Sequence, residues 1–260
     1  MFAFLYFSQM TFKNASQLFA AFYKTFGYLF LLIILVLFID STYISNKIPN
    51  NQHLATLITL IAFAILYYKS TSRLREQLIY AIIIGYVGEH LFSLGFGMYT
   101  YRLERVPHYV PIGHAIVLAA AFNFCKKSIV RNNRKLLEKF FAIYVLVYAS
   151  MFLIFAGDVF GFIMSLFVVY LLRNKLRERL FYLSMHFAVT FLEITGTSFE
   201  CWYWPEIAFD KFSFLKSANP PSGISLLYFL LDLGSLWLYK KRHKIAWARM
   251  KNVRKLREFR

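Results

Sequence analysis

Eight runs of mostly apolar residues, separated by short polar segments, dominate this chain. A membrane-spanning helix needs roughly 20 mostly apolar residues, and most of the runs approach that length. Only 17% of the residues are charged, whereas a soluble domain has about 25%. We therefore expect an all-α, polytopic integral membrane helix bundle that forms a single domain over residues 1–260. The expected transmembrane helices, about eight in number, cover residues 25–44, 54–68, 77–97, 110–125, 139–156, 159–172, 180–199 and 223–239.

The 30 Lys and Arg residues are distributed unevenly along the chain. The segments before the first run, after each even-numbered run and at the C-terminus hold 25 of them, and the intervening loops hold 5. Cytoplasmic loops of membrane proteins carry such an excess of positive charge. The pattern predicts a multi-pass protein of the inner cell membrane with both termini in the cytoplasm. It argues against nucleic-acid binding, which the net charge of +17 alone would suggest.

Both ends of the chain lie outside the expected helices. Residues 1–12 are apolar but lack the basic region and cleavage site of a signal peptide, so they form either an interfacial helix or an extension of the first span. Residues 240–260 carry ten Lys or Arg with apolar residues at helical spacing. This pattern is typical of either a basic amphipathic helix on the anionic inner leaflet or a solvated flank that stops translocation.

The two cysteines, Cys125 and Cys201, are expected at opposite faces of the membrane, so we predict no disulfide between them. The sequence also lacks the Cys and His spacings of structural zinc sites.

Two stretches of the sequence, residues 89–114 and 193–223, are alike. Each has a Glu in an apolar run, then an aromatic-x-aromatic pair, a polar loop and a Pro-x-Gly that opens the next run. In addition, Asp40 ends the first run and Asp158 ends the fifth. These landmarks occur in the same order, which favours a parallel four-plus-four repeat with halves 1–125 and 139–239. The alternative is coincidence, because Pro at helix starts is common.

Glu89 and Glu193 are the strongest candidates for chemistry. An ionisable residue inside a membrane span is costly and marks a functional site by default. Burial disfavours the charged form of a carboxyl group, so one of the pair could hold a proton beside an ionised partner, as acid–base catalysis requires. The alternative is a structural role, in which each Glu only hydrogen-bonds a neighbouring helix.

Other titratable residues accompany the two glutamates. His114 lies one turn inside the fourth expected span, and Asp232 lies near the middle of the eighth; we predict both as catalytic. His186 precedes Glu193 by two helical turns on the same face, and we predict it to contact substrate. Imidazole with carboxylate suits iron, zinc or manganese, but no paired ligand motif appears, so a metal site stays an open alternative and we predict no cofactor.

Tyr99, Tyr101, Trp202 and Trp204 form the two aromatic pairs. Aromatic residues gather at membrane interfaces for reasons unrelated to function. The glycines before the tyrosines permit a sharp helix end, which would place the rings over the mouth of a cavity. We therefore predict these four side chains to bind substrate.

The segment Phe96-Gly97-Met98-Tyr99-Thr100-Tyr101, with Glu upstream and Val110-Pro111 downstream, resembles the carotenoid-biosynthesis membrane-protein family. That family includes hydratases that add water to an isoprenoid double bond. The chain departs from the family pattern in that Glu89 stands closer to Phe96, Ser93-Leu94-Gly95 replaces a Thr-Gly pair, and His114 stands near a usual Trp. The resemblance implies a membrane-embedded, lyase-like enzyme with a lipophilic substrate.

Two functions follow from these features. The first is an enzyme that acts on an isoprenoid, carotenoid or other lipid, by acid–base hydration on the glutamate pair. The alternative is a proton-coupled transporter or exporter, since intramembrane carboxylates serve both. The expected partners are membrane lipid and a lipophilic small molecule. The sequence does not indicate whether the protein forms oligomers. Nucleotide-driven work is excluded because no Walker or Rossmann motif is present.

Overall fold

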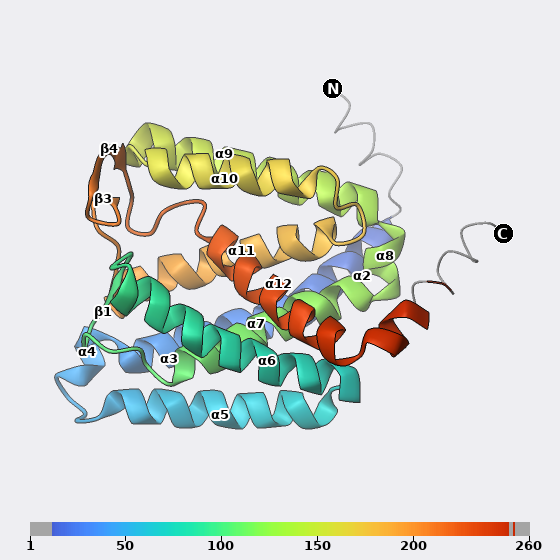
Figure 1. Ribbon diagram of the computed structural model, residues 1–260, viewed down its shortest axis with the longest axis horizontal. Coiled ribbons are helices and arrows are strands. Elements are labelled where there is room, and N and C mark those ends of the chain that lie inside the picture. The colour runs from blue at the N-terminus through green and yellow to red at the C-terminus, as the bar shows by residue number, and fades with distance from the viewer. Residues whose placement is uncertain (1–11, 250–251, 253–260) are drawn as a thin grey trace.

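The computed structural model describes residues 12–249 and residue 252, and over that range the protein is a bundle of long helices (Figure 1). Each of the eight apolar runs lies in a helix. The helical elements are α2 (Phe12–Phe22), η1 (Tyr23–Gly27), α3 (Tyr28–Asp40), α4 (Thr42–Ser45), α5 (Asn51–Lys69), α6 (Ser72–Glu89), η2 (His90–Gly95), α7 (Tyr109–Lys126), α8 (Ser128–Asn132), α9 (Arg134–Ala156), α10 (Val159–Leu172), α11 (Arg179–Ser198) and α12 (Ser225–Arg242).

Within the described range, five helical segments are long and apolar enough to cross a membrane. They are 14–40, 51–69, 72–95, 109–126 and 134–156. The apolar helix α10 has 14 residues and is shorter. An all-α membrane bundle is therefore supported, and eight spans stay a prediction.

The first helical segment differs from its predicted limits of 25–44. Helical structure runs without a break from Phe12 through η1 to Asp40. It ends there because Ser41 adopts an extended conformation and its side chain accepts a hydrogen bond from the Ile44 backbone, as a cap for α4. Residues 1–11 and the end of the basic tail, residues 250–251 and 253–260, lie outside the described range.

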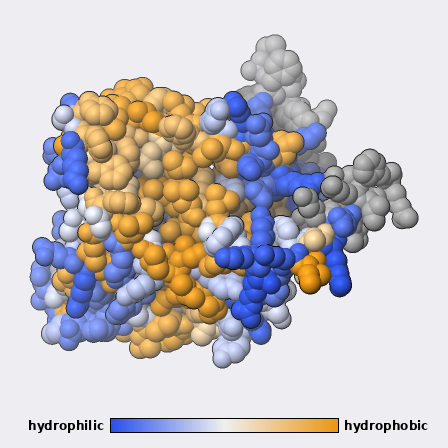
Figure 2. Space-filling model, viewed as in Figure 1, coloured by the Kyte–Doolittle hydropathy of each residue, from blue (hydrophilic) through white to orange (hydrophobic). Residues whose placement is uncertain are grey.

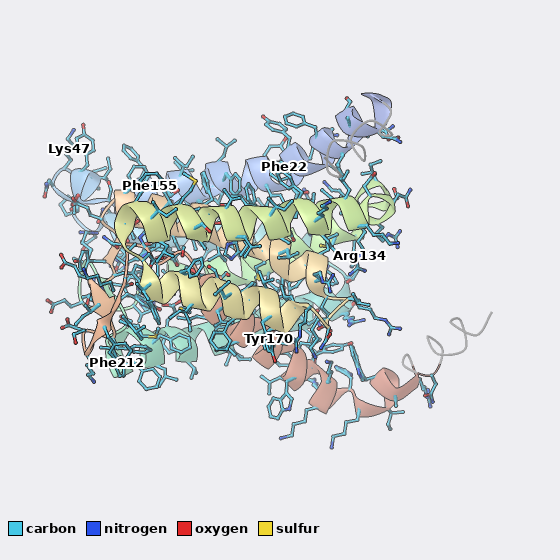
Figure 3. All side chains as sticks on the ribbon, turned by 90° about the horizontal axis from the view of Figure 1, so that it is seen from above. Phe22, Lys47, Arg134, Phe155, Tyr170 and Phe212 are labelled. Atoms are coloured by element: carbon cyan, nitrogen blue, oxygen red, sulfur yellow. The ribbon has the colours of Figure 1, made fainter. Side chains whose placement is uncertain are left out.

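The surface has a wide apolar zone with hydrophilic residues at the two ends of the bundle (Figure 2). Large apolar side chains point outward in this zone, including Phe155 at 82% exposure and Ile154 at 73%. A soluble protein rarely exposes such an extended apolar surface, whereas a bilayer would cover it. The α4 turn and the strands lie at one end, called here the hairpin end, with Lys47 and Phe212 (Figure 3). Arg134 lies at the opposite end.

The interior of the bundle is formed largely by α7 and α11, which bury most of their residues. α7 packs against α6, α5 and α11, and α11 packs against α9, α3 and α12. Phenylalanine rings fill the junction of α3 and α11, where Phe30 and Phe191 stack with their centroids 4.0 Å apart. Polar residues in this apolar interior therefore need hydrogen-bond partners, because a buried polar group without one is costly.

Two short antiparallel strand pairs occupy the hairpin end. β1 (Thr100–Tyr101) pairs with β2 (Trp202–Tyr203), and β3 (Ile207–Ala208) pairs with β4 (Phe212–Lys216). The first pair joins the loop after η2 to the loop after α11, which are about 100 residues apart in the chain. Gly97, with a φ of 63°, turns the chain from η2 into β1, and a backbone in this region favours glycine.

Asp158 fixes the loop before α12. Its buried carboxylate accepts hydrogen bonds from the backbone N–H groups of Gly161, Ala218 and Ser222, at 3.0, 3.1 and 2.7 Å. The first of these bonds caps α10. A tight turn therefore joins α9, which ends at Ala156, to α10, which begins at Val159.

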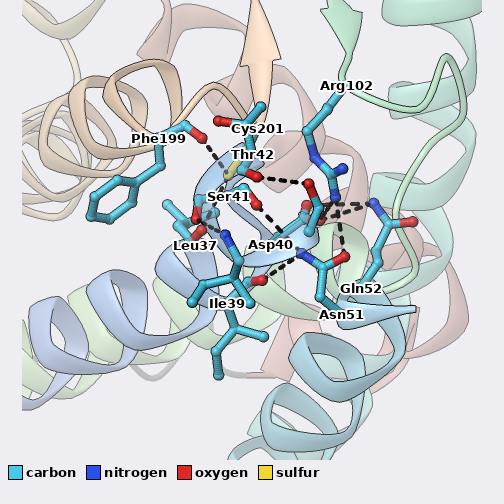
Figure 4. Close-up of polar contacts among 12 residues, drawn as sticks. Leu37, Ile39, Asp40, Ser41, Thr42, Asn51, Gln52, Arg102, Phe199 and Cys201 are labelled. Atoms are coloured by element: carbon cyan, nitrogen blue, oxygen red, sulfur yellow. Dashed lines mark hydrogen bonds and ion pairs between the residues drawn. The ribbon is translucent and has the colours of Figure 1, made fainter. Parts of the chain in front are cut away.

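Asp40 fixes the loop before α7 in a similar way (Figure 4). Its buried carboxylate pairs with Arg102 at 2.7 Å and accepts a hydrogen bond from the Tyr109 hydroxyl at 2.7 Å. Cys201 lies beside this cluster, fully buried, with its Sγ donating to the Leu37 carbonyl at 3.3 Å. Burial, with a further contribution from the Asp40 charge, raises the pKa of the Cys201 thiol well above its usual range.

We expect Asp40→Asn to open the hairpin end and expose Cys201. The substitution leaves the Arg102 charge buried without its partner, and breaking a buried ion pair costs about 3–5 kcal/mol. Maleimide labelling of a Cys125→Ser background measures the result: Cys201 should resist labelling in the parent and react in the Asp40→Asn protein. Ser213→Cys, at an exposed position of β4, gives the fully labelled control. Equal protection of Cys201 with and without Asp40 would show that the cluster does not hold this end together.

Candidate functional site

The Glu89 side chain is buried in the interior and has three hydrogen-bond partners. Glu89 is the last residue of α6, and it is 4% exposed. Its Oε2 accepts hydrogen bonds from the hydroxyls of Tyr99 and Tyr101, each at 2.5 Å. Its Oε1 lies 2.6 Å from Nε2 of His114 on α7.

The Glu193 side chain has a matching set of partners. Glu193 lies on α11 and is also 4% exposed. Its Oε2 accepts hydrogen bonds from the indole N–H groups of Trp202 and Trp204, at 2.9 and 3.2 Å. Its Oε1 accepts a hydrogen bond from the Tyr228 hydroxyl of α12 at 2.9 Å.

The two sets of partners correspond position by position. In each, one carboxylate oxygen is bound by the aromatic-x-aromatic pair that follows the helix, and the other by a side chain of the next long helix. The strand pair β1–β2 aligns Thr100 with Tyr203. Consequently Tyr99 packs on Trp204 and Tyr101 packs on Trp202, with ring centroids 4.5 and 6.1 Å apart.

Both tyrosines that serve Glu89 remain hydroxyl donors. Burial, and after it the charge of Glu89, raises the pKa of Tyr99 and of Tyr101 well above the ordinary value. Each hydroxyl therefore stays protonated and donates a hydrogen bond to the carboxylate. A hydrogen bond to a charged group contributes about 1.5–3 kcal/mol, so three donors together offset much of the cost of burying Glu89.

A close approach of Trp202 to α11 makes the Glu193 arrangement possible. The Trp202 ring lies directly against Gly196, one turn after Glu193, where an added Cβ would overlap the ring. Only glycine leaves room for the indole N–H to reach Oε2 of Glu193. The sequence pattern alone offered no sign of this requirement.

A cavity in the centre of the bundle brings the two glutamates together. Both carboxylates line it, and its remaining wall is almost entirely apolar. The wall residues from α3 and α7 include Leu29, Ile33, Val36, Gly113, Ile116 and Val117. His114, Tyr99, Tyr101, Trp202 and Trp204, which we predicted from sequence, also line this cavity.

Two predicted site residues lie apart from the cavity. His186 is fully buried, and its Nδ1 lies 2.6 Å from the Ser225 hydroxyl, without contact to either glutamate. Asp232 lies one turn beyond Tyr228 on α12 and is 8% exposed. No described residue hydrogen-bonds its Oδ2. The two-turn spacing from Glu193 placed His186 on the correct helix face but too far along the axis.

Sequence reasoning missed Tyr228, which completes the Glu193 shell. The matching His114 directly follows the Pro-x-Gly of its half, whereas Tyr228 comes five residues after Gly223. Helical geometry could have identified Tyr228, because it lies about one turn beyond the position in α12 that matches His114, and residues one turn apart lie on the same helix face.

The residues in the described range hold no group of three or more His, Cys, Asp or Glu that could bind a metal ion. The chemical capacity of the site therefore rests on two carboxyl groups, an imidazole and aromatic rings. Each carboxylate has about four acceptor positions and uses three, so each keeps a position for a further proton or ligand.

No protein-family model, no curated protein and no solved structure matches this chain. The resemblance to the carotenoid-biosynthesis membrane proteins therefore stays a prediction.

We expect Gly196→Ala to lower the thermal stability of the purified protein. The added methyl group displaces the Trp202 ring from Glu193, and overpacking of this kind costs about 1–3 kcal/mol. Gly113→Ala is the matched control, because Gly113 also lies on a helix at the cavity and a Cβ there meets nothing within 4 Å. Thermal unfolding in detergent measures both. Similar melting temperatures for the two variants would contradict the close packing of Trp202 on α11.

Proposed function

We propose that this protein is an integral membrane enzyme that adds water to a double bond of a lipophilic, isoprenoid-like substrate, with Glu89 and Glu193 as the acid–base pair. The observation that carries the proposal is the shared cavity, which combines two buried carboxyl groups with apolar walls. Such walls suit a hydrocarbon substrate, and a few convergent polar groups are typical of ligand sites.

The hydrogen-bond partners of the two glutamates support a different role for each. Glu89 faces His114, which becomes cationic when it is protonated and then favours an ionised Glu89. Glu193 faces only the neutral donors Trp202, Trp204 and Tyr228. Since two nearby carboxylates do not both ionise readily, Glu193 holds the proton and acts as the acid, and Glu89 acts as the base.

The reaction balances without a cofactor. Glu193 transfers its proton to one carbon of the double bond, and the adjacent carbon becomes a cation. The faces of Trp202, Trp204 and the two tyrosines stabilise this cation by cation–π interaction. Water attacks the cation and loses a proton to Glu89. A proton then returns from Glu89 to Glu193, directly or through water, and the pair is restored.

The transporter alternative is less well supported by the geometry. A proton-coupled carrier needs a polar route to each face of the membrane. Here the wall of the central cavity is apolar, and the strand pair β1–β2 and the buried Asp40 cluster lie at the hairpin end.

We also propose that all eight long helices cross the membrane, with both termini in the cytoplasm, and that the halves are repeats. The correspondence of the Glu89 and Glu193 shells supports the repeat. So does the parallel between Asp40 and Asp158, which hold the loops before α7 and α12 respectively.

Glu89→Gln and Glu193→Gln should each abolish conversion of the substrate. Glutamine keeps the shape and still accepts hydrogen bonds, but it neither stores nor supplies the proton. Lipid extracts from membranes that express each variant, analysed by mass spectrometry, provide the measurement. The parent should yield a product heavier than its precursor by one water, and both variants should accumulate the precursor. Loss of one catalytic acid or base typically costs about 10²–10⁴-fold in rate.

Asp232→Asn is the control for this experiment, because it alters a buried carboxyl group outside the cavity. It should convert substrate at the rate of the parent. Full activity in either glutamine variant would remove that glutamate from the mechanism. Absence of any copurifying isoprenoid, together with proton-linked solute uptake in vesicles, would favour the transporter.

Topology reporters test the proposed orientation. A reporter fused after Arg260 should respond as a cytoplasmic protein, and one inserted at 210–211, between β3 and β4, should respond as external. The basis is the excess of Lys and Arg in the segments before the first apolar run, after each even-numbered run and at the end of the sequence. A cytoplasmic response at 210–211 would reject the proposed topology.

A further inference from the structure

A second cavity lies at the hairpin end, outside the site described above. It lies between the start of α5, η2 and the loop before α7. Its volume is about 220 Å³, many times the minimum of about 10–15 Å³ that holds one water. The lining residues are Gln52, His53, Thr56, His90, Leu94, Arg105, Val106 and His108.

The composition of this cavity is unusual for the chain. Three of the six histidines converge on it from separate segments, together with Arg105. Arg105 is one of only five Lys or Arg outside the basic blocks. The convergence of these groups from α5, η2 and a loop is a property of the fold, because they are up to 55 residues apart in sequence.

No described residue neutralises these groups. No ion pair or side-chain hydrogen bond is formed by Arg105, His53 or His108 with residues 12–249 or 252. Two buried acidic groups are committed elsewhere: Asp40 pairs with Arg102, and Glu89 pairs with His114. Glu104 precedes Arg105 on the loop, and both residues are exposed, but no ion pair joins their side chains. Arg105 therefore brings to the cavity a positive charge that has no ion-pair partner among the described residues.

We propose that this cavity binds a phosphate group. Arg105 presents the planar set of N–H donors that binds phosphate oxygens in pairs. His53 and His108 add ring N–H donors, and they add charge when they are protonated. His90 Nδ1 lies 2.8 Å from the Tyr86 carbonyl, which leaves its Nε2 for the ligand in the protonated form. A metal is not the expected ligand, since no described cluster has the geometry to hold one.

The position of the cavity suits the head group of a lipid. Exposed leucines continue from it along the bundle surface: Leu54 and Leu57 on α5, and Leu91 and Leu94 on η2. Acyl chains lie along such side chains, while the phosphate lies at the polar end of the bundle. Free phosphate offers the same chemistry, so the experiment separates the two sources.

Thermal unfolding of the purified protein in detergent tests the proposal. One arm adds inorganic phosphate against chloride at equal ionic strength. The other adds mixed micelles with phosphatidic acid against micelles with phosphatidylcholine alone. A ligand that binds the folded state raises the melting temperature. We expect a rise in at least one arm, and Arg105→Gln should weaken the apparent affinity by about tenfold.

Lys211→Gln is the matched control, because it removes one positive charge from the turn before β4, at the same end of the bundle, and Lys211 does not line the cavity. It should behave as the parent. His108→Gln gives a second variant with an independent prediction of weaker binding, in case Arg105→Gln does not fold. A response to inorganic phosphate supports a site for free phosphate, and a response to phosphatidic acid alone supports a lipid head group.

The proposal fails if neither arm raises the melting temperature. It also fails if Arg105→Gln and His108→Gln respond as strongly as the parent, or if Lys211→Gln weakens binding equally. The readout is binding, not turnover, so its outcome is independent of the hydration reaction proposed above.

Discussion

Burial of two carboxyl groups in an apolar helix bundle is the constraint on which the rest of this structure depends. Each ionised carboxylate is costly in the membrane interior, by at least about 2.5–3.5 kcal/mol at a helix centre. The protein offsets this cost with three hydrogen-bond partners for Glu89 and three for Glu193. Much of the hairpin end serves this purpose. The loop that follows η2 and the loop that follows α11 each fold back, so that their aromatic side chains hydrogen-bond the glutamate of the preceding helix.

The arrangement of loops explains why the Asp40 and Asp158 clusters exist. A tyrosine or tryptophan that must meet a carboxylate within hydrogen-bond distance needs a rigid backbone. Asp40 holds Arg102 beside β1, and Asp158 holds the backbone at Ser222 before α12. Both aspartates are fully buried, so their hydrogen bonds act in a low dielectric and resist local opening. The supporting shell of the site is thus built from the ends of the helices.

The sequence was sufficient to predict the helices and to identify the two glutamates and the aromatic pair that follows each. It predicted that these rings bind substrate, whereas their hydrogen bonds to the carboxylates are visible only in the structure. Apolar run length and charge asymmetry are strong signals, and Glu89, Tyr99 and Trp204 stood out because polar or repeated features are rare in such runs. Distances across the bundle could not be predicted. His186 and Asp232 lie on α11 and α12, which also carry Glu193 and Tyr228, but they are too far along the helix axes to line the cavity. Their distance from the cavity depends on how far neighbouring helices are shifted along their axes, which the sequence does not show. Tyr228 and the space at Gly196 emerge only from packing between elements.

The ring contacts across β1 and β2 have a consequence for how the two glutamates affect each other. Tyr99 packs on Trp204 and Tyr101 packs on Trp202, so each ring that binds one carboxylate lies against a ring that binds the other. Protonation of one carboxylate changes its hydrogen bonds and displaces the aromatic side chains that donate them. The rings packed against those side chains must then move as well, because a packed interior has little free space. The packed rings thereby couple the positions of the groups around Glu89 to those around Glu193. A change in the protonation of one glutamate therefore affects the other in two ways. One is the displacement of the packed rings, and the other is the electrostatic interaction between the two carboxyl groups.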